Sequence, residues 1–154
     1  STALDEVGGE FNAYTAREYT CYHARVLDED LPMALDVLGD MLTASLLTAE
    51  DVEAERGVIL EEWRLGLGAN ERIQEKQFPL LFKGSRYAER VPIGTPEIIQ
   101  NATPARLKQF YADWYRPDLM AVIAVGDFDP AIVERMVIAR FRVFSEAALW
   151  SPRW

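Results

Sequence analysis

Two glutamates on one predicted helix face are the residues of this chain whose type and spacing could do chemistry. Glu55 and Glu62 are seven residues apart, which is two turns of an α-helix, so their side chains stack one above the other. They share that face with apolar positions at Val52, Ile59 and Trp63. Carboxylates on an apolar stripe lose hydration, so each needs a cation, a metal or a proton. The spacing is therefore compatible with a metal-binding or catalytic pair.

A solvated acidic helix explains the same spacing. Acid-rich surface helices are common, and a polar face wider than the one drawn would leave both carboxylates in water. On spacing alone this is the simpler interpretation, and the metal or catalytic role stays open beside it.

The single histidine, His23, and the single cysteine, Cys21, invite a metal interpretation because they share one face of a predicted strand. Two ligands are fewer than the three or four that zinc takes in proteins. A lone strand histidine is more often packed or hydrogen-bonded, so we expect His23 to be structural. One cysteine allows no internal disulfide and leaves the redox compartment open.

The helix that positions the glutamates is predicted from Thr48 to Gly66. Thr48 is a good N-cap, Asp51 follows three residues later as a capping carboxylate, and Gly66 supplies a stop. Before it, residues 11–16 and 19–26 alternate with the period of a strand, and they predict a β-hairpin.

The other elements follow from helical spacing, caps and turn residues. They are a turn at Arg17-Glu18, a helix over 29–47 with a core stripe, a helix over 70–82 broken by Pro79, a loop over 83–94, helices that begin at Pro96 and Pro104 after Thr95 and Thr103, core-facing Leu107, Phe110, Tyr111 and Trp114, and a last helix over 131–144.

The run LMAVIAV, residues 119–125, is continuously apolar and predicts a strand buried on both faces. With the hairpin, it predicts an α+β fold in which helices pack against a mostly antiparallel sheet that includes residues 11–16, 19–26 and 119–125.

Composition excludes some classes of function. The chain has 154 residues, enough for one domain, and a net charge of −9, which argues against binding nucleic acid because phosphates want a basic surface. No apolar run approaches the roughly 20 residues that span a bilayer. We expect a soluble protein of the bacterial cytoplasm or periplasm.

Several motifs, in order, resemble the insulinase and pitrilysin-like zinc metallopeptidases, the inverzincins, which include the mitochondrial processing peptidases. The motifs are Gly8-Gly9 before FNAYT, ERGVILEEW, GTPEIIQNATPARLKQFYADWYRPD and GDFDP. The resemblance runs from about Val7 to Phe144. It implies a partial insulinase-like half-domain over residues 1–144, while residues 145–154 form an unassigned C-terminal tail.

The resemblance implies roles for five residues. Glu62 matches the glutamate that completes the zinc site, and Glu55 matches a second acid that supports catalysis by orienting a ligand or tuning its charge. Asn12, Ala13 and Tyr14 match a strand whose edge pairs with extended peptide substrate. Strand addition suits unfolded peptides because backbone hydrogen bonds carry the affinity. From the pattern alone, a plain structural hairpin is the alternative.

The family's other two zinc ligands and its general base lie in one helix as H-x-x-E-H, a motif absent from this sequence. It belongs further upstream of Glu62 than residue 1, so we expect the chain to be the middle and end of one family domain. Zinc is the expected cofactor of the complete domain. In this chain alone we expect weak or no zinc binding and no activity, because one carboxylate is a poor zinc site.

Two functions follow from the resemblance. The first is a zinc-dependent metalloendopeptidase domain that hydrolyses peptides. The alternative is a non-catalytic peptidase-like subunit that binds peptide or pairs with a catalytic partner. The expected partners are an extended peptide and a second peptidase-like domain or subunit, or self-association, with no nucleic acid and no membrane span. An unrelated acidic α/β domain is the remaining alternative.

Overall fold

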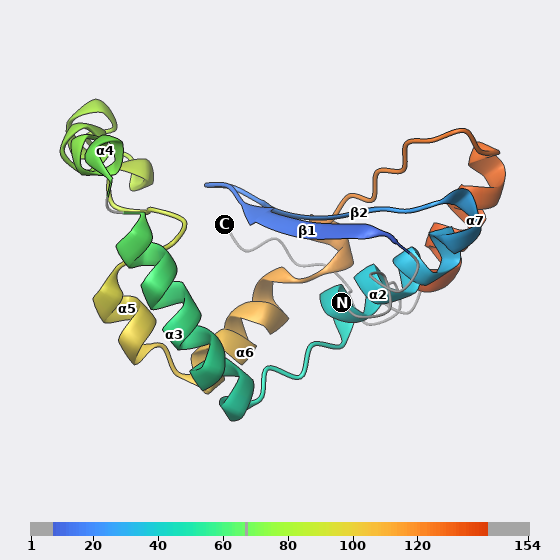
Figure 1. The fold of residues 1–154 in the computed structure, drawn as a ribbon, viewed down its shortest axis with the longest axis horizontal. Coiled ribbons are helices and arrows are strands. Elements are labelled where there is room, and N and C mark those ends of the chain that lie inside the picture. The colour runs from blue at the N-terminus through green and yellow to red at the C-terminus, as the bar shows by residue number, and fades with distance from the viewer. Residues whose placement is uncertain (1–7, 67, 142–154) are drawn as a thin grey trace. The chain divides into compact units, whose positions relative to one another are not determined.

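The computed structural model describes residues 8–66 and 68–141 (Figure 1). In chain order the elements are β1 (Glu10–Thr15), β2 (Thr20–Arg25), η1 (Asp28–Asp30), α2 (Leu31–Thr43), α3 (Ala49–Leu65), α4 (Ala69–Leu81), η2 (Arg86–Ala88), α5 (Pro96–Asn101), α6 (Pro104–Trp114), η3 (Pro117–Leu119) and α7 (Pro130–Phe141), where η marks a short 3-10 helix.

The described residues fall into two compact units. The first holds 8–14, 22–46 and 109–141, and the second holds 15–21, 47–66 and 68–108. The mixture of helices with a small antiparallel sheet agrees with the predicted α+β class.

Strands β1 and β2 form a two-stranded hairpin, as the alternation predicted. The backbone N–H of Ala16 donates to the carbonyl of Tyr19 at 2.8 Å. This bond closes a tight turn at Arg17-Glu18, where the sequence placed it.

Side-chain contacts fix the register of the hairpin. Thr15 lies opposite Thr20, with hydroxyl oxygens 3.3 Å apart, and Glu10 pairs with Arg25 at 3.3 Å. Opposed residues in an antiparallel pair alternate between hydrogen-bonded and non-hydrogen-bonded positions. Counting back from the hydrogen-bonded pair at the turn, Ala13 is at a non-hydrogen-bonded position. Its N–H and C=O therefore point to the open edge of β1.

In the first unit, α2 lies beside α7 (Figure 1). Ala34 and Leu35 of α2 and Val133 of α7 are buried, which confirms the centre of the core stripe predicted over 29–47. Arg140 of α7 reaches back to α2, where it donates to the carbonyl of Asp36 at 3.0 Å.

A tyrosine cluster also belongs to the first unit. The hydroxyls of Tyr22 and Tyr115 are 2.7 Å apart, and the rings of Tyr111 and Tyr115 stack with centroids separated by 4.7 Å. The Tyr111 hydroxyl donates to the carbonyl of Met41 at 3.2 Å. Burial and the hydrogen bond with Tyr115 raise the pKa of Tyr22 well above its ordinary value.

In the second unit, α3 packs against α5 (Figure 1). Val52 of α3 and Ile99 of α5 are the buried apolar residues of this contact. The predicted caps are confirmed: Thr95 accepts from the N–H of Ile98 at 3.4 Å, and Thr103 accepts from the N–H of Arg106 at 3.2 Å.

The strand predicted over 119–125 is wrong. Leu119 ends η3, residues 120–125 have no regular secondary structure, and Ile123 and Val125 are 84% and 92% exposed. An apolar run becomes a buried strand only when neighbouring strands take up its backbone hydrogen bonds. Within the described residues, the only sheet is the hairpin, so this run has no partner.

Three smaller predictions also needed correction. Helix α4 continues through Pro79, because a proline this near the C-terminal end removes one backbone bond in a turn that is already ending. Helix α2 stops at Thr43 instead of Leu47. Phe110 and Trp114 are exposed and lie against each other, with ring centroids 6.3 Å apart, instead of facing a core.

The last helix is confirmed for the residues of α7. The end predicted for it at 142–144 and the tail at 145–154 lie outside the described residues. No helix in the described part of the chain has the length and apolar character needed to cross a membrane.

Candidate functional site

Helix α3 carries the predicted pair of acids and begins where the sequence placed it. The side-chain oxygen of Thr48 accepts a hydrogen bond from the N–H of Asp51 at 3.1 Å, which is the capping contact expected at a helix N-terminus. The N–H of Gly66 donates to the carbonyl of Glu62 at 2.9 Å and closes the last turn. Glu55 and Glu62 therefore lie on one continuous helix, two turns apart.

The packed face of α3 is narrower than the sequence suggested. Val52 is buried, and Ile59 and Trp63 are half-buried, whereas Glu55 and Glu62 are exposed. The acids lie at the edge of the apolar stripe instead of within it. In the described part of the chain they remain hydrated, so the predicted desolvation cost does not arise.

The described residues alone do not fit a zinc ion. No three histidine, cysteine, aspartate or glutamate side chains gather there as a metal site. Glu55 and Glu62 offer two carboxylates separated by about 10.5 Å along the helix axis, whereas zinc takes three or four ligands at roughly 2.0–2.3 Å. Glu62 could serve as a ligand only together with groups from another segment.

His23 is exposed on β2, and its ring centroid lies 6.3 Å from that of Tyr14. Cys21 is half-buried on the same strand. Neither residue belongs to a group of three possible ligands among the described residues, so the structure gives no support to a metal role for this pair.

Arg56 fastens α3 to α5. Its guanidinium donates to the carbonyl of Ile99 and, at 2.7 Å, to the carbonyl of Ala102, at the C-terminal end of α5. It also donates to both carboxylate oxygens of Glu53, at 2.9 and 3.1 Å. The hydrogen bond between the two side chains lowers the pKa of Glu53 and raises the pKa of Arg56. Sequence reasoning missed this anchor.

The predicted peptide-binding residues Asn12, Ala13 and Tyr14 are exposed on β1. The side-chain oxygen of Asn12 accepts a hydrogen bond from the N–H of Ala13 at 2.8 Å. This N–H belongs to the open edge, so the Asn12 amide occupies the position that the carbonyl of an added strand would take.

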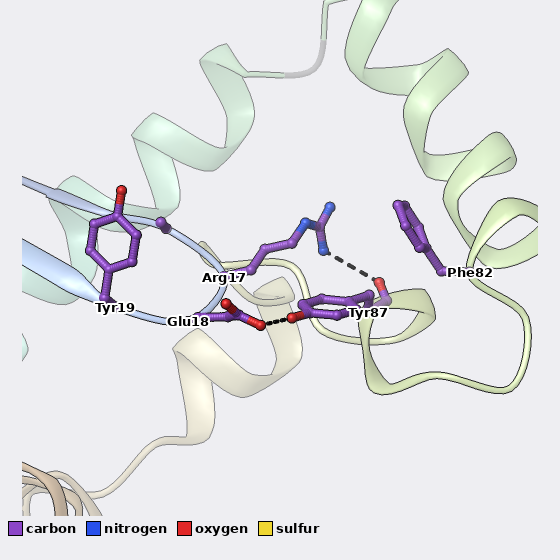
Figure 2. A pocket seen from close by; sticks show the side chains of 6 residues that line it. Arg17, Glu18, Tyr19, Phe82 and Tyr87 are labelled. Carbon is purple, nitrogen blue, oxygen red and sulfur yellow. Dashed lines mark hydrogen bonds between the residues drawn. The ribbon is translucent and has the colours of Figure 1, made fainter. Parts of the chain in front are cut away.

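The tip of the hairpin is held by the end of α4 and by the segment that follows it, and Figure 2 shows the contacts with that segment. The Arg17 guanidinium lies 4.7 Å from the centroid of the Phe78 ring and donates to the carbonyls of Tyr87 and Arg90 at 3.3 and 2.9 Å. Glu18 accepts a hydrogen bond from the Tyr87 hydroxyl. A depression of about 370 Å³ beside these contacts is lined by Ala16, Arg17, Glu18, Tyr19, Phe82 and Tyr87.

Comparison with known proteins gives the class of this chain. The family model described as insulinase (peptidase family M16) matches residues 1–75, and the model described as the peptidase M16 inactive domain matches residues 101–147. The chain belongs to peptidase family M16, whose zinc proteases use zinc.

The individual relatives agree. An uncharacterized zinc protease of Streptomyces coelicolor is 45% identical over 141 residues, which are 92% of this chain and 31% of that protein. The crystal structure of the first half of the periplasmic protease PqqL from Escherichia coli superposes with a TM-score of 0.89 at 29% identity, over 99% of this chain and 34% of that one.

A mutant of the ferredoxin protease FusC, solved in complex with Arabidopsis ferredoxin, gives a TM-score of 0.88 at 32% identity, over 99% of this chain and 18% of that one. The chain thus spans about a third of the length of the first two relatives and less of the third.

Proposed function

We propose that this chain is the part of an M16 zinc endopeptidase domain that contributes one zinc ligand, Glu62, and a strand edge for the peptide. The observation that carries the proposal is the geometry of α3. One face of the helix is packed and fastened to α5, while Glu55 and Glu62 project together from an exposed face. An exposed acid on a fixed helix is available to ligands brought by another segment. Membership of the M16 family supports zinc as the metal.

The roles of the two acids differ in this proposal. Glu62 supplies one anionic oxygen to the metal, and the remaining ligands come from outside this sequence, which has no H-x-x-E-H. Glu55, one heptad earlier, orients a ligand or tunes its charge. A zinc ion held by Glu62 together with ligands from outside this sequence would supply a water of lowered pKa and would polarise the scissile carbonyl.

The proposed substrate is a polypeptide in extended conformation, paired with the open edge of β1 at Asn12, Ala13 and Tyr14. The outward N–H of Ala13 donates to the Asn12 side-chain oxygen in this structure, and in this proposal a carbonyl of the peptide replaces that oxygen as the acceptor. The relative solved in complex with ferredoxin supports a protein-derived substrate, and the periplasmic relative supports the periplasm as the compartment.

A non-catalytic peptidase-like subunit is the second candidate. Residues 101–147 match the domain that the family description calls inactive, and the sequence lacks the motif for the other ligands. In either function, the exposed side chains of Ile123 and Val125 favour docking on a second peptidase-like domain or self-association, because large exposed apolar patches are seldom left open.

Glu62→Gln and Glu55→Gln in the full-length gene product separate the two functions. We expect Glu62→Gln to abolish tight zinc binding and Glu55→Gln to keep the metal but lower the rate by about 10–100-fold. Glu50→Gln, an exposed acid in the first turn of the same helix, is the control and should leave both unchanged. If the wild-type protein binds peptide, but binds no zinc and does not hydrolyse the peptide, it is the non-catalytic subunit.

A further inference from the structure

Arg56 differs from an ordinary surface arginine of a helix. Its side chain is only 15% exposed, although guanidinium groups are seldom buried unless their N–H groups are paired. Here they are paired: two carbonyls at the end of α5 and the Glu53 carboxylate accept from it. The carbonyls at a helix C-terminus have no partners within the helix, so Arg56 also satisfies groups that α5 leaves open.

A second arginine of α3, Arg64, can be compared with Arg56. Two Glu–Arg pairs with the same spacing occur along this helix, Glu53 with Arg56 and Glu61 with Arg64, at 2.9 and 3.0 Å. The Arg64 side chain is 70% exposed. Ion pairs of that kind contribute little to stability. Of the two arginines, Arg56 is the one with hydrogen bonds to carbonyls outside α3.

The angular position of Arg56 around α3 can be compared with the positions of Glu55 and Glu62. At about 100° per residue, Arg56 lies within roughly 40° of the buried Val52. Glu55 and Glu62 lie within about 20° of each other and roughly 100–120° from Arg56. Any rotation of α3 about its axis therefore moves both carboxylates together. The Arg56 guanidinium, bonded to the carbonyls of Ile99 and Ala102, resists that rotation better than apolar contacts do, because hydrogen bonds are directional.

We infer that Arg56 is a positioning residue: by bonding the end of α5 it sets the rotation of α3, and so aims Glu62 at the metal and Glu55 at its support. The inference rests on the proposed zinc site. Arg56 itself touches neither metal nor substrate. Its effect reaches the site through the direction of two side chains on its own helix.

The test uses the full-length protein with Arg56→Met, which keeps much of the apolar stem and removes every donor. Zinc affinity is measured by competition with a chelator, and kcat and KM are measured on an unstructured peptide. Both measurements are made well below the unfolding temperature of each variant. We expect zinc affinity to fall about tenfold, as on loss of groups that orient metal ligands. We expect kcat to fall while KM stays unchanged, because the peptide pairs with β1. Arg56→Lys, which keeps the charge and part of the hydrogen bonding, should recover part of the loss.

Two control variants separate positioning from loss of stability. Arg64→Met removes the matched exposed ion pair and should leave zinc affinity unchanged. Val52→Ala weakens the packing of α3 on α5 without touching the carbonyl bonds, and serves as a stability-matched reference. If Arg56→Met loses no more zinc affinity than Val52→Ala at an equal fall in unfolding temperature, or resembles Arg64→Met, the inference is wrong. If Glu62→Gln keeps wild-type zinc affinity, the proposed zinc site fails and this inference fails with it.

Discussion

The open edge of β1 can be tested at a single backbone donor. The register places the N–H of Ala13 outside the hairpin, so Ala13→Pro removes no hydrogen bond between β1 and β2. Proline is tolerated at such outward positions of edge strands. The substitution should therefore leave the hairpin folded while it removes the donor that an added strand would use and that now bonds the Asn12 side chain.

The expected magnitude follows from the bond that is lost. A peptide carbonyl that pairs with Ala13 loses one hydrogen bond, and at an exposed edge such a bond contributes about 0.5–1.5 kcal/mol net, because the released carbonyl can bond to water. At about 1.4 kcal/mol per factor of ten, KM should rise by roughly 2- to 12-fold. The chemical step should change little, because Glu55 and Glu62 are untouched.

The control is a second alanine with the same geometry on the other strand. By the same register, Ala24 of β2 also points its N–H away from the hairpin, towards the opposite edge. Steady-state kinetics of the full-length Ala13→Pro and Ala24→Pro proteins on one unstructured peptide compare the two edges. Equal rises in KM for both variants, or no rise for Ala13→Pro, would refute pairing of the peptide with β1.

Two further predictions concern the rest of the fold. Gly39→Ala should lower the unfolding temperature, because its added Cβ would lie 2.7 Å from the Arg140 Nε and displace the side chain that donates to the Asp36 carbonyl. Gly57→Ala meets nothing within 4 Å and should stabilise the fold by up to about 1 kcal/mol. Thermal unfolding of both variants checks the contrast. The raised pKa of Tyr22 stabilises the folded state below the ordinary tyrosine pKa of about 10, and this stability is lost as pH rises beyond it. Tyr22→Phe should weaken this loss of stability at alkaline pH, measured by denaturation over a range of pH values. If the loss is unchanged, Tyr22 is not its origin.

Local features of the sequence predicted local structure well. The caps at Thr48, Thr95 and Thr103 and the turn at Arg17-Glu18 all formed, because each depends on groups only a few residues apart. The shared helix face of the two acids followed from helical geometry for the same reason. Whether that face is packed depends on other elements, and the packed face of α3 is narrower than the sequence predicted.

Long-range features were beyond the pattern. The run at 119–125 has the composition of a buried strand, but a strand also needs neighbours, and composition does not say whether they are present. Arg56 looked like any helical arginine, because its carbonyl partners Ile99 and Ala102 are 43 and 46 residues away in sequence. The hydrogen bond from Arg17, at the hairpin tip, to the carbonyl of Arg90 was not predicted for the same reason, since the two residues are 73 apart in sequence.

Zinc-edge anomalous diffraction from crystals of the full-length protein tests most directly whether Glu62 is a zinc ligand. We predict one zinc ion with a Glu62 carboxylate oxygen about 2.0–2.2 Å away, two histidines completing the protein ligands, and Glu55 near the site without binding the metal. A zinc ion held entirely by other residues, with Glu62 exposed to solvent, would contradict the claim.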